Sequence, residues 1–333
     1  MTDWPLDWQA LVDEAVRRRK EEGHTQKSLA AIAGVSMPTV NAFERGDIRL
    51  RLEKVFDILG ALGMVTLPSA PGSLAAFVRA ARQRWSELVE PLPPAHPSRQ
   101  SLGHVTYAYA IADGEIELPL GSLRKQLQDL PSTSGWSPFW VPTKDNIRPV
   151  IRDALIECWI GNPDADRVFR DAAHSDFWQV TGDLKAYLQR GYQEDGSGNL
   201  EPGTIFDLTL PVWQTAEVFV HILNLAKALD LNLEAPIQFE SRYTGLEGRE
   251  LVTWAAPLRR WSVAETHRSR TNAVKLATST SIIELMNDFG DVVHRTLTPL
   301  YDLFDGFDAT QQFVEAELAE FRKSALQAQI EPQ

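Results

Sequence analysis

The sequence holds a single cysteine, Cys158, and no run of about 18 apolar residues, the length that a membrane-spanning helix requires. One cysteine cannot form an internal disulfide. The first ten residues, MTDWPLDWQA, also lack the basic and apolar regions of a secretion signal. We therefore expect a cytoplasmic protein with no membrane partner. Cys158 itself lies in the apolar run LIECWIG, which favours a buried, inert thiol over a nucleophile.

Motifs of the common enzyme classes are missing as well. The sequence has no phosphate-binding loop, no dinucleotide-binding glycine pattern, no His-Glu-x-x-His motif and no Gly-x-Ser-x-Gly motif. None of its seven histidines stands at zinc-ligand spacing from the cysteine. His174 and Asp176 lie close together, but a polar cluster at a helix end is favoured over a catalytic pair. We therefore expect no catalytic residue, no metal site and no cofactor, although an enzyme with a dispersed site stays an alternative.

The segment 190–203, RGYQEDGSGNLEPG, gathers acidic and glycine residues around Glu194 and Asp195. A calcium-binding loop places oxygen ligands at alternating positions, and this segment does not. The pattern therefore predicts a hairpin or a surface loop.

Negative charge dominates, but it is distributed unevenly. The whole chain has a net charge of −12, which argues against nucleic-acid binding by the chain as a whole. Residues 1–66 carry 9 basic and 10 acidic side chains, a net of −1, whereas residues 67–333 carry 24 and 35, a net of −11. A small domain with a net charge near zero can still present a basic face, and the acidic remainder can bind a basic protein partner.

Helical periodicity marks the start of the chain, and proline marks the break after it. Apolar stripes and glycine stops predict a compact all-α domain at 1–66, with one helix ending at Gly34 and the next running from a Ser36 cap to Gly46. A further helix is predicted at 74–89, followed by the four prolines of 90–98, which indicate a stiff linker. We therefore divide the chain into a domain at 1–66, a helix and proline-rich linker at 67–98, and a larger domain at 99–333.

The larger domain mixes helical and strand-like patterns, which favours an α+β class. Helices are predicted at 213–229, 281–297 and 308–329. Strands are predicted at 114–120, 137–142, 154–160, 203–211, 235–243 and 250–255. Aromatic residues are dense around Trp136, Trp159 and Trp178, where a bulky core is favoured over a ligand pocket.

Residues 25–46, TQKSLAAIAGVSMPTVNAFERG, predict two short helices joined by a tight turn. Small residues at Ala30 and Ala31 allow the helices to cross closely, and Val40 and Phe43 turn the second helix toward a core. Pro38 is acceptable in the first turn of a helix, because no intrahelical N–H bond is lost there. The outward face of the second helix then carries Ser36, Met37, Pro38, Thr39, Asn41, Ala42 and Arg45.

This stretch and the amphipathic helix after it resemble the Cro/C1-type (XRE) helix-turn-helix domains over residues 8–64. The resemblance implies that Thr25 and Gln26 contact phosphate. It also implies that the first turn of the second helix enters the major groove and that residues one turn later reach base edges, which gives Ser36, Met37, Pro38, Thr39, Asn41 and Ala42. Of these, Asn41 alone offers an amide suited to adenine, so sequence specificity should be modest. A helix-turn-helix used only to pack or to bind a partner is the alternative.

Basic side chains around this unit favour phosphate contact, since each neutralised phosphate releases counterions. They are Arg17, Arg18, Arg19, Lys27, Arg45, Arg49 and Arg51. A second basic stretch, 256–275, offers Arg259, Arg260, Arg268 and Arg270 as candidate anion-binding residues. A solvated basic face is an equally good interpretation of that stretch.

These observations together predict a prokaryotic transcriptional regulator that binds double-stranded DNA with modest sequence specificity. Its α+β domain would sense a signal, oligomerise or bind a partner. A homodimer is expected, because one helix-turn-helix with few base readers discriminates poorly. The candidate dimer contact is the apolar stripe Val314, Leu318, Phe321 and Ala325, which packing onto its own domain explains equally well. The alternative function is a DNA-binding accessory subunit of a phage-defence or toxin–antitoxin complex.

Overall fold

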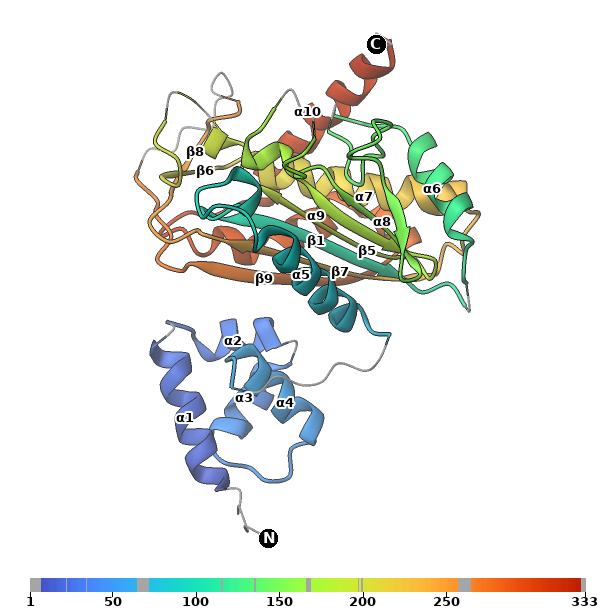
Figure 1. The fold of residues 1–333 in the computed structure, drawn as a ribbon. Helices are drawn as coiled ribbons and strands as arrows, with labels where there is room; N and C mark the ends of the chain where they lie inside the picture. The colour runs from blue at the N-terminus through green and yellow to red at the C-terminus, as the bar shows by residue number, and fades with distance from the viewer. Residues whose placement is uncertain are drawn as a thin grey trace. The chain divides into compact units, whose positions relative to one another are not determined.

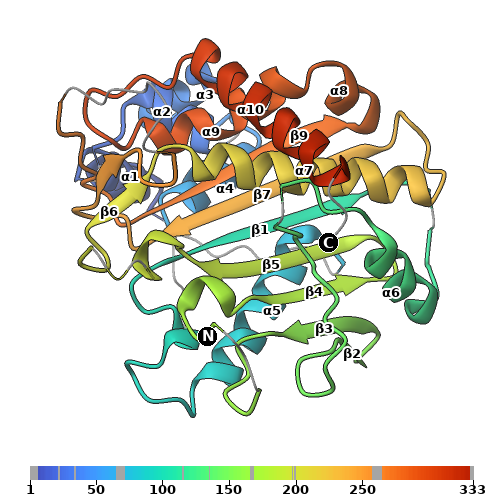
Figure 2. The same cartoon turned by 90° about the horizontal axis from the view of Figure 1, so that it is seen from above.

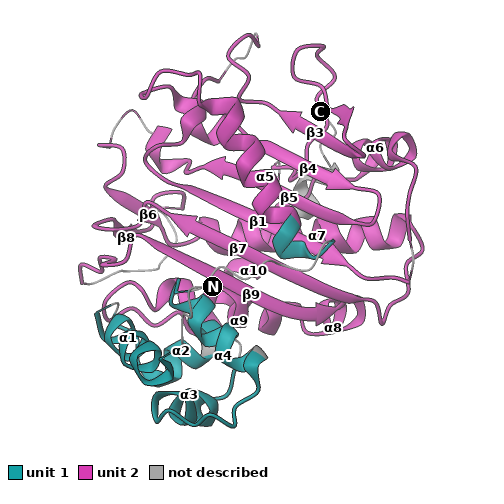
Figure 3. Cartoon of the chain, turned by 60° about the horizontal axis from the view of Figure 1, so that its bottom comes forward, with its two compact units in different colours: residues 1–76 teal, residues 77–333 magenta. Residues whose placement is uncertain are grey.

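The computed structural model describes residues 7–21, 23–33, 35–64, 72–114, 116–134, 136–165, 169–196, 198, 200–256 and 265–330. The chain separates into two compact units, unit 1 at Met1–Ala76 and unit 2 at Phe77–Gln333 (Figure 3). Each unit has a hydrophobic core of its own. None of the described helices has both the length and the apolar character that crossing a membrane requires.

In the part of unit 1 that the structure describes, four helices share one core. They are α1 (Trp8–Glu21), α2 (Gln26–Ala33), α3 (Met37–Glu44) and α4 (Leu52–Ala61). Val12, Leu29, Phe43 and Ile58, one from each helix, are fully buried in that core. The amphipathic spacing read from the sequence therefore gives the predicted helical domain.

Unit 2 is an antiparallel sheet with helices packed on it, in agreement with the predicted α+β class (Figure 1). In sheet order its strands are β2 (Val150–Arg152), β3 (Leu155–Trp159), β4 (Phe177–Thr181), β5 (Lys185–Gly191), β1 (His104–Ile111), β7 (Pro236–Thr244) and β9 (Ala273–Ser281). A separate parallel pair joins β6 (Ile205–Asp207) to β8 (Glu250–Val252).

The helices of unit 2 lie on both faces of the sheet. Figure 2 looks onto the face covered by α7, α9 and α10, and Figure 3 looks onto the face crossed by α5. The α-helices are α5 (Leu74–Val89), α6 (Leu120–Asp129), α7 (Leu210–Ala228), α8 (Ile282–Asn287), α9 (Phe289–Tyr301) and α10 (Gln311–Ile330). Short 3-10 turns occur at Pro97–Arg99, Ala172–His174 and Glu194–Gly196.

Strand β1 shows how the two faces are filled. Tyr107 and Tyr109 lie on the same face of the strand, because side chains two residues apart share one face. Both are fully buried in the core beneath α7. The small residues Thr106 and Ala108 face the other way and are buried as well. On that second face α5 is anchored by Arg84, whose guanidinium binds the carboxylate of Glu157 at 3.0 Å.

Several sequence predictions are confirmed and others are wrong. The predicted helices at 74–89, 213–229 and 308–329 correspond to α5, α7 and α10, whereas 281–297 is divided into α8 and α9. The predicted strands at 154–160 and 235–243 correspond to β3 and β7. Residues 137–142 and the described part of 114–120 form no strand, because neither segment pairs with a neighbour in the sheet.

The proline-rich segment 90–98 is packed into unit 2 and is not the predicted linker. Ser98 is fully buried, and its hydroxyl donates to the carbonyl of Gly161 at 2.6 Å. Arg99 Nε donates to the carbonyl of Leu92 at 2.8 Å, which holds the segment folded upon itself. These long-range contacts outweigh the stiffness that proline confers, and they place 77–98 with the larger unit.

The apolar stripe of α10 is used inside unit 2. Val314, Leu318 and Phe321 are at most 3% exposed, and Phe321 packs edge-on against the ring of Trp213. The indole N–H of Trp213 donates to Glu317 at 2.8 Å. The prediction that this stripe forms a dimer contact is therefore wrong for these three residues, and the side chain of Ala325 lies outside the described residues.

Segment 190–203, predicted as a hairpin or a surface loop, is packed into unit 2 at Glu194 and Asp195. Asp195 forms a 2.7 Å ion pair with Arg249, whose side chain is fully buried. The same guanidinium donates to the carbonyls of Leu102, Gly245 and Ile205, so all its polar groups are engaged in this dry site. Glu194, also buried, accepts the backbone N–H of Asp207 at 3.0 Å.

The buried Glu194 carboxyl predicts a stability that falls as pH rises. Burial raises its pKa from 4.5 to about 7. Between these two values the unfolded chain has lost the proton while the folded chain still holds it, so rising pH favours unfolding there. Glu194→Gln should remove on the order of 3 kcal/mol of this pH-dependent loss. Urea unfolding of the wild type and of Glu194→Gln at pH 4.5 and 7.5 measures this loss. If the free energy of unfolding falls equally in the two proteins, Glu194 is not its cause.

Candidate nucleic-acid interface

The two ends of helix α3 are set by residues of its own sequence. Ser36 has extended backbone angles, and its hydroxyl accepts the N–H of Thr39 at 3.3 Å and lies 2.7 Å from the Thr39 hydroxyl. Pro38 stands in the first turn, where its missing N–H leaves no bond unmade. At the other end Gly46 adopts a φ of +76°, a left-handed conformation that favours glycine. The predicted turn residue Gly34 lies outside the described residues.

The carboxylate of Glu44 joins three helices of unit 1. It accepts Arg19 Nε of α1 at 2.5 Å and Nη2 at 3.1 Å, and it accepts the side-chain amide of Gln26 of α2 at 2.8 Å. Arg19 and Glu44 have side chains only 12% and 10% exposed. This contact brings the start of α2 beside the end of α3, so it fixes the orientation of the helix that would meet DNA.

The predicted DNA-binding residues lie at the start of α2 and along α3. Thr25 is exposed and caps α2, since its hydroxyl accepts the N–H of Ser28 at 3.0 Å. Because a helix start leaves several N–H groups without intrahelical partners, the start of α2 can accept a phosphate. The exposed members of the set are Thr25, Lys27, Ser36, Met37, Pro38 and Arg45, and the half-buried ones are Gln26, Thr39, Asn41 and Ala42.

The seven basic side chains that were predicted to favour phosphate contact divide into two groups that the sequence did not distinguish. Four of them are held by acids of the same unit: Arg17 and Arg18 by Glu14, Arg19 by Glu44, and Arg49 by Asp47. Lys27, Arg45 and Arg51 form no ion pair within the part of the chain that the structure describes. Phosphate contact is therefore most favourable at these three, because no internal partner has to be displaced.

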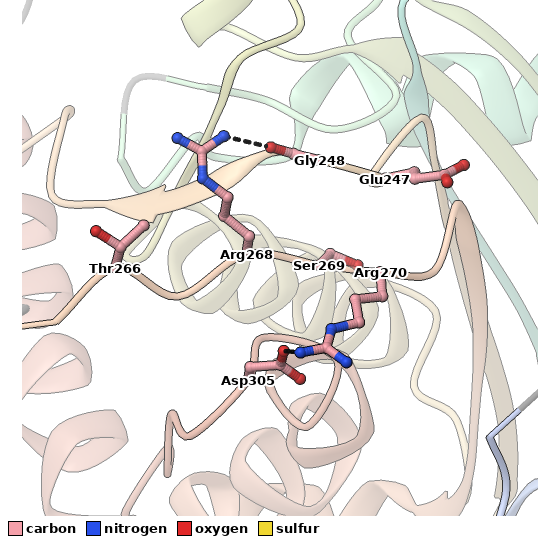
Figure 4. Close-up of a pocket in the computed structure, with 7 residues that line it drawn as sticks. All are labelled: Glu247, Gly248, Thr266, Arg268, Ser269, Arg270 and Asp305. Atoms are coloured by element: carbon pink, nitrogen blue, oxygen red, sulfur yellow. Dashed lines mark hydrogen bonds and ion pairs between the residues drawn. The ribbon is translucent and has the colours of Figure 1, made fainter.

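The second basic stretch lines a shallow hollow of unit 2 (Figure 4). There Arg268 pairs with Glu250 at 2.6 Å and donates to the carbonyl of Gly248, and Arg270 pairs with Asp305 at 2.6 Å. An incoming anion would compete with these carboxylates. Anion binding by Arg268 and Arg270 stays a prediction, and Arg259 and Arg260 lie outside the described residues.

The remaining candidates of unit 2 belong to its packing. His174 Nδ1 lies 2.8 Å from Asp171, whereas Asp176 is buried 3.6 Å from Arg190. The Arg190 guanidinium stacks 4.7 Å from the ring centre of Trp136. Burial raises the pKa of the Cys158 thiol well above its usual value, which agrees with an inert thiol. Across the described residues, no group of three or more His, Cys, Asp or Glu is arranged to hold a metal ion.

Comparison with known proteins bears on unit 1. Residues 17–68 match the helix-turn-helix family model, which confirms the predicted helix-turn-helix. The match supports a DNA-binding regulator as the general class of this chain. A comparison with curated proteins gives no match.

The Glu44 contact predicts a specific pattern of stability changes. Glu44→Ala should lower the free energy of unfolding of unit 1 by about 2–3 kcal/mol, because it leaves Arg19 shielded from water without its partner. The control Glu14→Ala removes the exposed pairs with Arg17 and Arg18 and should cost much less, because exposed ion pairs contribute little to stability. Urea unfolding followed by helical circular dichroism compares the two variants. Similar losses of unfolding free energy in the two variants would show that the Glu44 contact is no more stabilising than an exposed ion pair.

Proposed function

We propose that this chain is a prokaryotic transcriptional regulator whose unit 1 binds duplex DNA with the first turn of α3 in the major groove. The observation that carries the proposal is the arrangement of α3 itself. Its capped first turn is exposed and its orientation is fixed by Glu44. Unit 1 also offers the cations of Lys27, Arg45 and Arg51, which form no ion pair with the residues that the structure describes. A helix presented in this way fits the major groove, and cations beside it fit the phosphates.

The base-reading surface is small, so specificity is modest. Asn41 is the one amide on the outward face of α3, and it is suited to a bidentate contact with adenine. Met37, Pro38 and Ala42 offer apolar contact to thymine methyl groups. DNA shape and a second copy of the chain at a neighbouring half-site supply the remaining selectivity.

Unit 2 acts in this proposal through binding and not through chemistry. Its negative net charge repels DNA and suits a basic protein partner or a sensing role. A DNA-binding accessory subunit of a phage-defence or toxin–antitoxin complex is the second candidate, and the net charge of −11 on residues 67–333 is the observation that favours it. Co-purification from native cells separates the candidates, because the accessory subunit would bring a stoichiometric basic partner with it.

The proposal predicts DNA binding that weakens steeply with salt. Each phosphate contact contributes about −0.9 to the slope of log K against log salt. Gel shifts of the full chain on mixed-sequence duplex across a salt series measure this slope. If no binding occurs even at low salt, the proposed function is wrong.

Single substitutions should separate base readers from phosphate contacts. Asn41→Ala should cost about 1–3 kcal/mol on a preferred site and relax the preference at one base pair. Arg45→Ala should weaken binding to all sequences about equally. Arg17→Ala is the matched control, since Glu14 and Glu21 already neutralise that side chain. Competition assays over a library of duplexes give the profiles, and identical profiles for Asn41→Ala and Arg45→Ala would refute this division of roles.

A further inference from the structure

Strand β9 forms one edge of the seven-stranded sheet, and it is long for an edge. It covers nine residues, Ala273–Ser281, and among the described strands it pairs only with β7 (Figures 1 and 3). The register with β7 runs without interruption from Thr244 opposite Ala273 to Pro236 opposite Ser281, so no bulge bends the strand. The opposite edge, β2, has only three residues.

The backbone of β9 presents its outer groups in a regular row. The carbonyl of Pro236 accepts the N–H of Ala112, next to β1, so the backbone groups of Pro236 point toward β1. Because these groups alternate along a strand, those of Ile237 point toward β9 and its partner Thr280. The residues of β9 that point to β7 are therefore Val274, Leu276, Thr278 and Thr280. Those that point outward are Ala273, Lys275, Ala277, Ser279 and Ser281.

This outer row is almost unused. In the residues that the structure describes, two contacts involve it. Arg295 Nη2 approaches the carbonyl of Ser279 at 3.5 Å, and Ser281 is the N-cap of α8, where its carbonyl accepts the first bond of that helix. Natural edge strands are usually shielded by proline, bulges or charges. Here β9 contains no proline and one charge, Lys275, which is bound by Glu240 of β7 at 2.9 Å. An open edge of this kind is a template for another strand.

We propose that β9 pairs antiparallel with the β9 of a second copy of this chain, about a two-fold axis at Ala277. A two-fold axis sets a strand beside itself in the antiparallel direction. Centred at Ala277, it places Lys275 opposite the partner's Ser279, and Ala273 opposite the partner's Ser281. The outward groups other than the Ser281 carbonyl then exchange hydrogen bonds, up to about eight across the interface.

Charge favours this register and a second copy of the chain as the partner. Centring the axis on Lys275 would set two ammonium groups directly opposite each other, which is unfavourable. Centring it on Ala277 keeps them apart, and the exposed side chains near the axis, those of Ala277 and Ser279, are small and uncharged. Val314, Leu318 and Phe321 of the α10 stripe are buried in their own unit and unavailable for such a contact. The use of the dimer, to present two copies of unit 1 to DNA, rests on the proposed function, whereas the strand pairing does not.

The test places opposite charges at the axis. Ala277 is exposed and lies outside the core, so substitutions there spare the fold of the monomer. Ala277→Lys and Ala277→Glu each set like charges against themselves across the axis. The lysine variant is the milder for the monomer, because Glu240 lies opposite Ala277 on β7 of the same chain. Mixing the two variants sets lysine against glutamate. Gln128→Lys, an exposed site on α6, controls for added charge.

Analytical ultracentrifugation of the full chain at micromolar concentration is the readout. The wild type and Gln128→Lys should be dimers. Each Ala277 variant alone should dissociate with a Kd raised by roughly tenfold or more, and the equimolar mixture should recover a heterodimer. A monomeric wild type, a dimer that both variants leave unchanged, or a mixture that does not reassociate would each overturn the proposal. Gel shifts of the monomeric variants at low salt test DNA binding by unit 1 independently.

Discussion

The carboxylate of Glu44 holds the parts of unit 1 that would meet DNA. A buried carboxylate is costly unless donors surround it, and Glu44 has two from Arg19 and one from Gln26. These donors come from α1 and α2, while Glu44 ends α3. One polar contact therefore sets the angle of α3 against the two helices behind it, and the exposure of its first turn follows from that angle.

Unit 2 buries several of its charged side chains. Arg249 is fully buried with Asp195, and Asp207 is fully buried, where its carboxylate accepts backbone N–H groups at the start of α7 and from Trp254 and Ala255. These contacts fasten irregular segments onto the sheet. Of the two edges of the seven-stranded sheet, β9 is the longer, and few contacts from the described residues reach its outer backbone groups, which is why we assign the contact between copies to this edge.

Local signals explain what could be predicted from the sequence. The Ser36 cap, the early Pro38 and the final Gly46 define α3 without any knowledge of the rest of the chain. Strands β1, β5 and β9 could not be found in this way. In β1 the tyrosines alternate with small residues that are buried under α5, and β9 carries mostly small polar residues, so neither shows the usual contrast between an apolar and a polar face.

Contacts between residues far apart in the sequence explain most of the predictions that were wrong. The acids of segment 190–203 suggest a surface loop until Arg249, some fifty residues later, is placed against Asp195. The prolines of 90–98 suggest a linker until Gly161 is placed against Ser98. Some of the ion pairs that neutralise basic residues of unit 1 could have been predicted. Glu14 and Arg18 stand four residues apart on one helix face, and so do Arg17 and Glu21. The pairing of Arg19 with Glu44 was not.

The central claim is that α3 and the start of α2 contact DNA. Hydrogen–deuterium exchange of the full chain, with and without duplex at low salt, tests it most directly. The account predicts that DNA slows exchange in peptides covering residues 25–46, around the starts of α2 and α3, and leaves the sheet strands of unit 2 unchanged apart from the β9 edge. Protection confined to unit 2, or unchanged exchange at 25–46 under conditions where the duplex is bound, would contradict it.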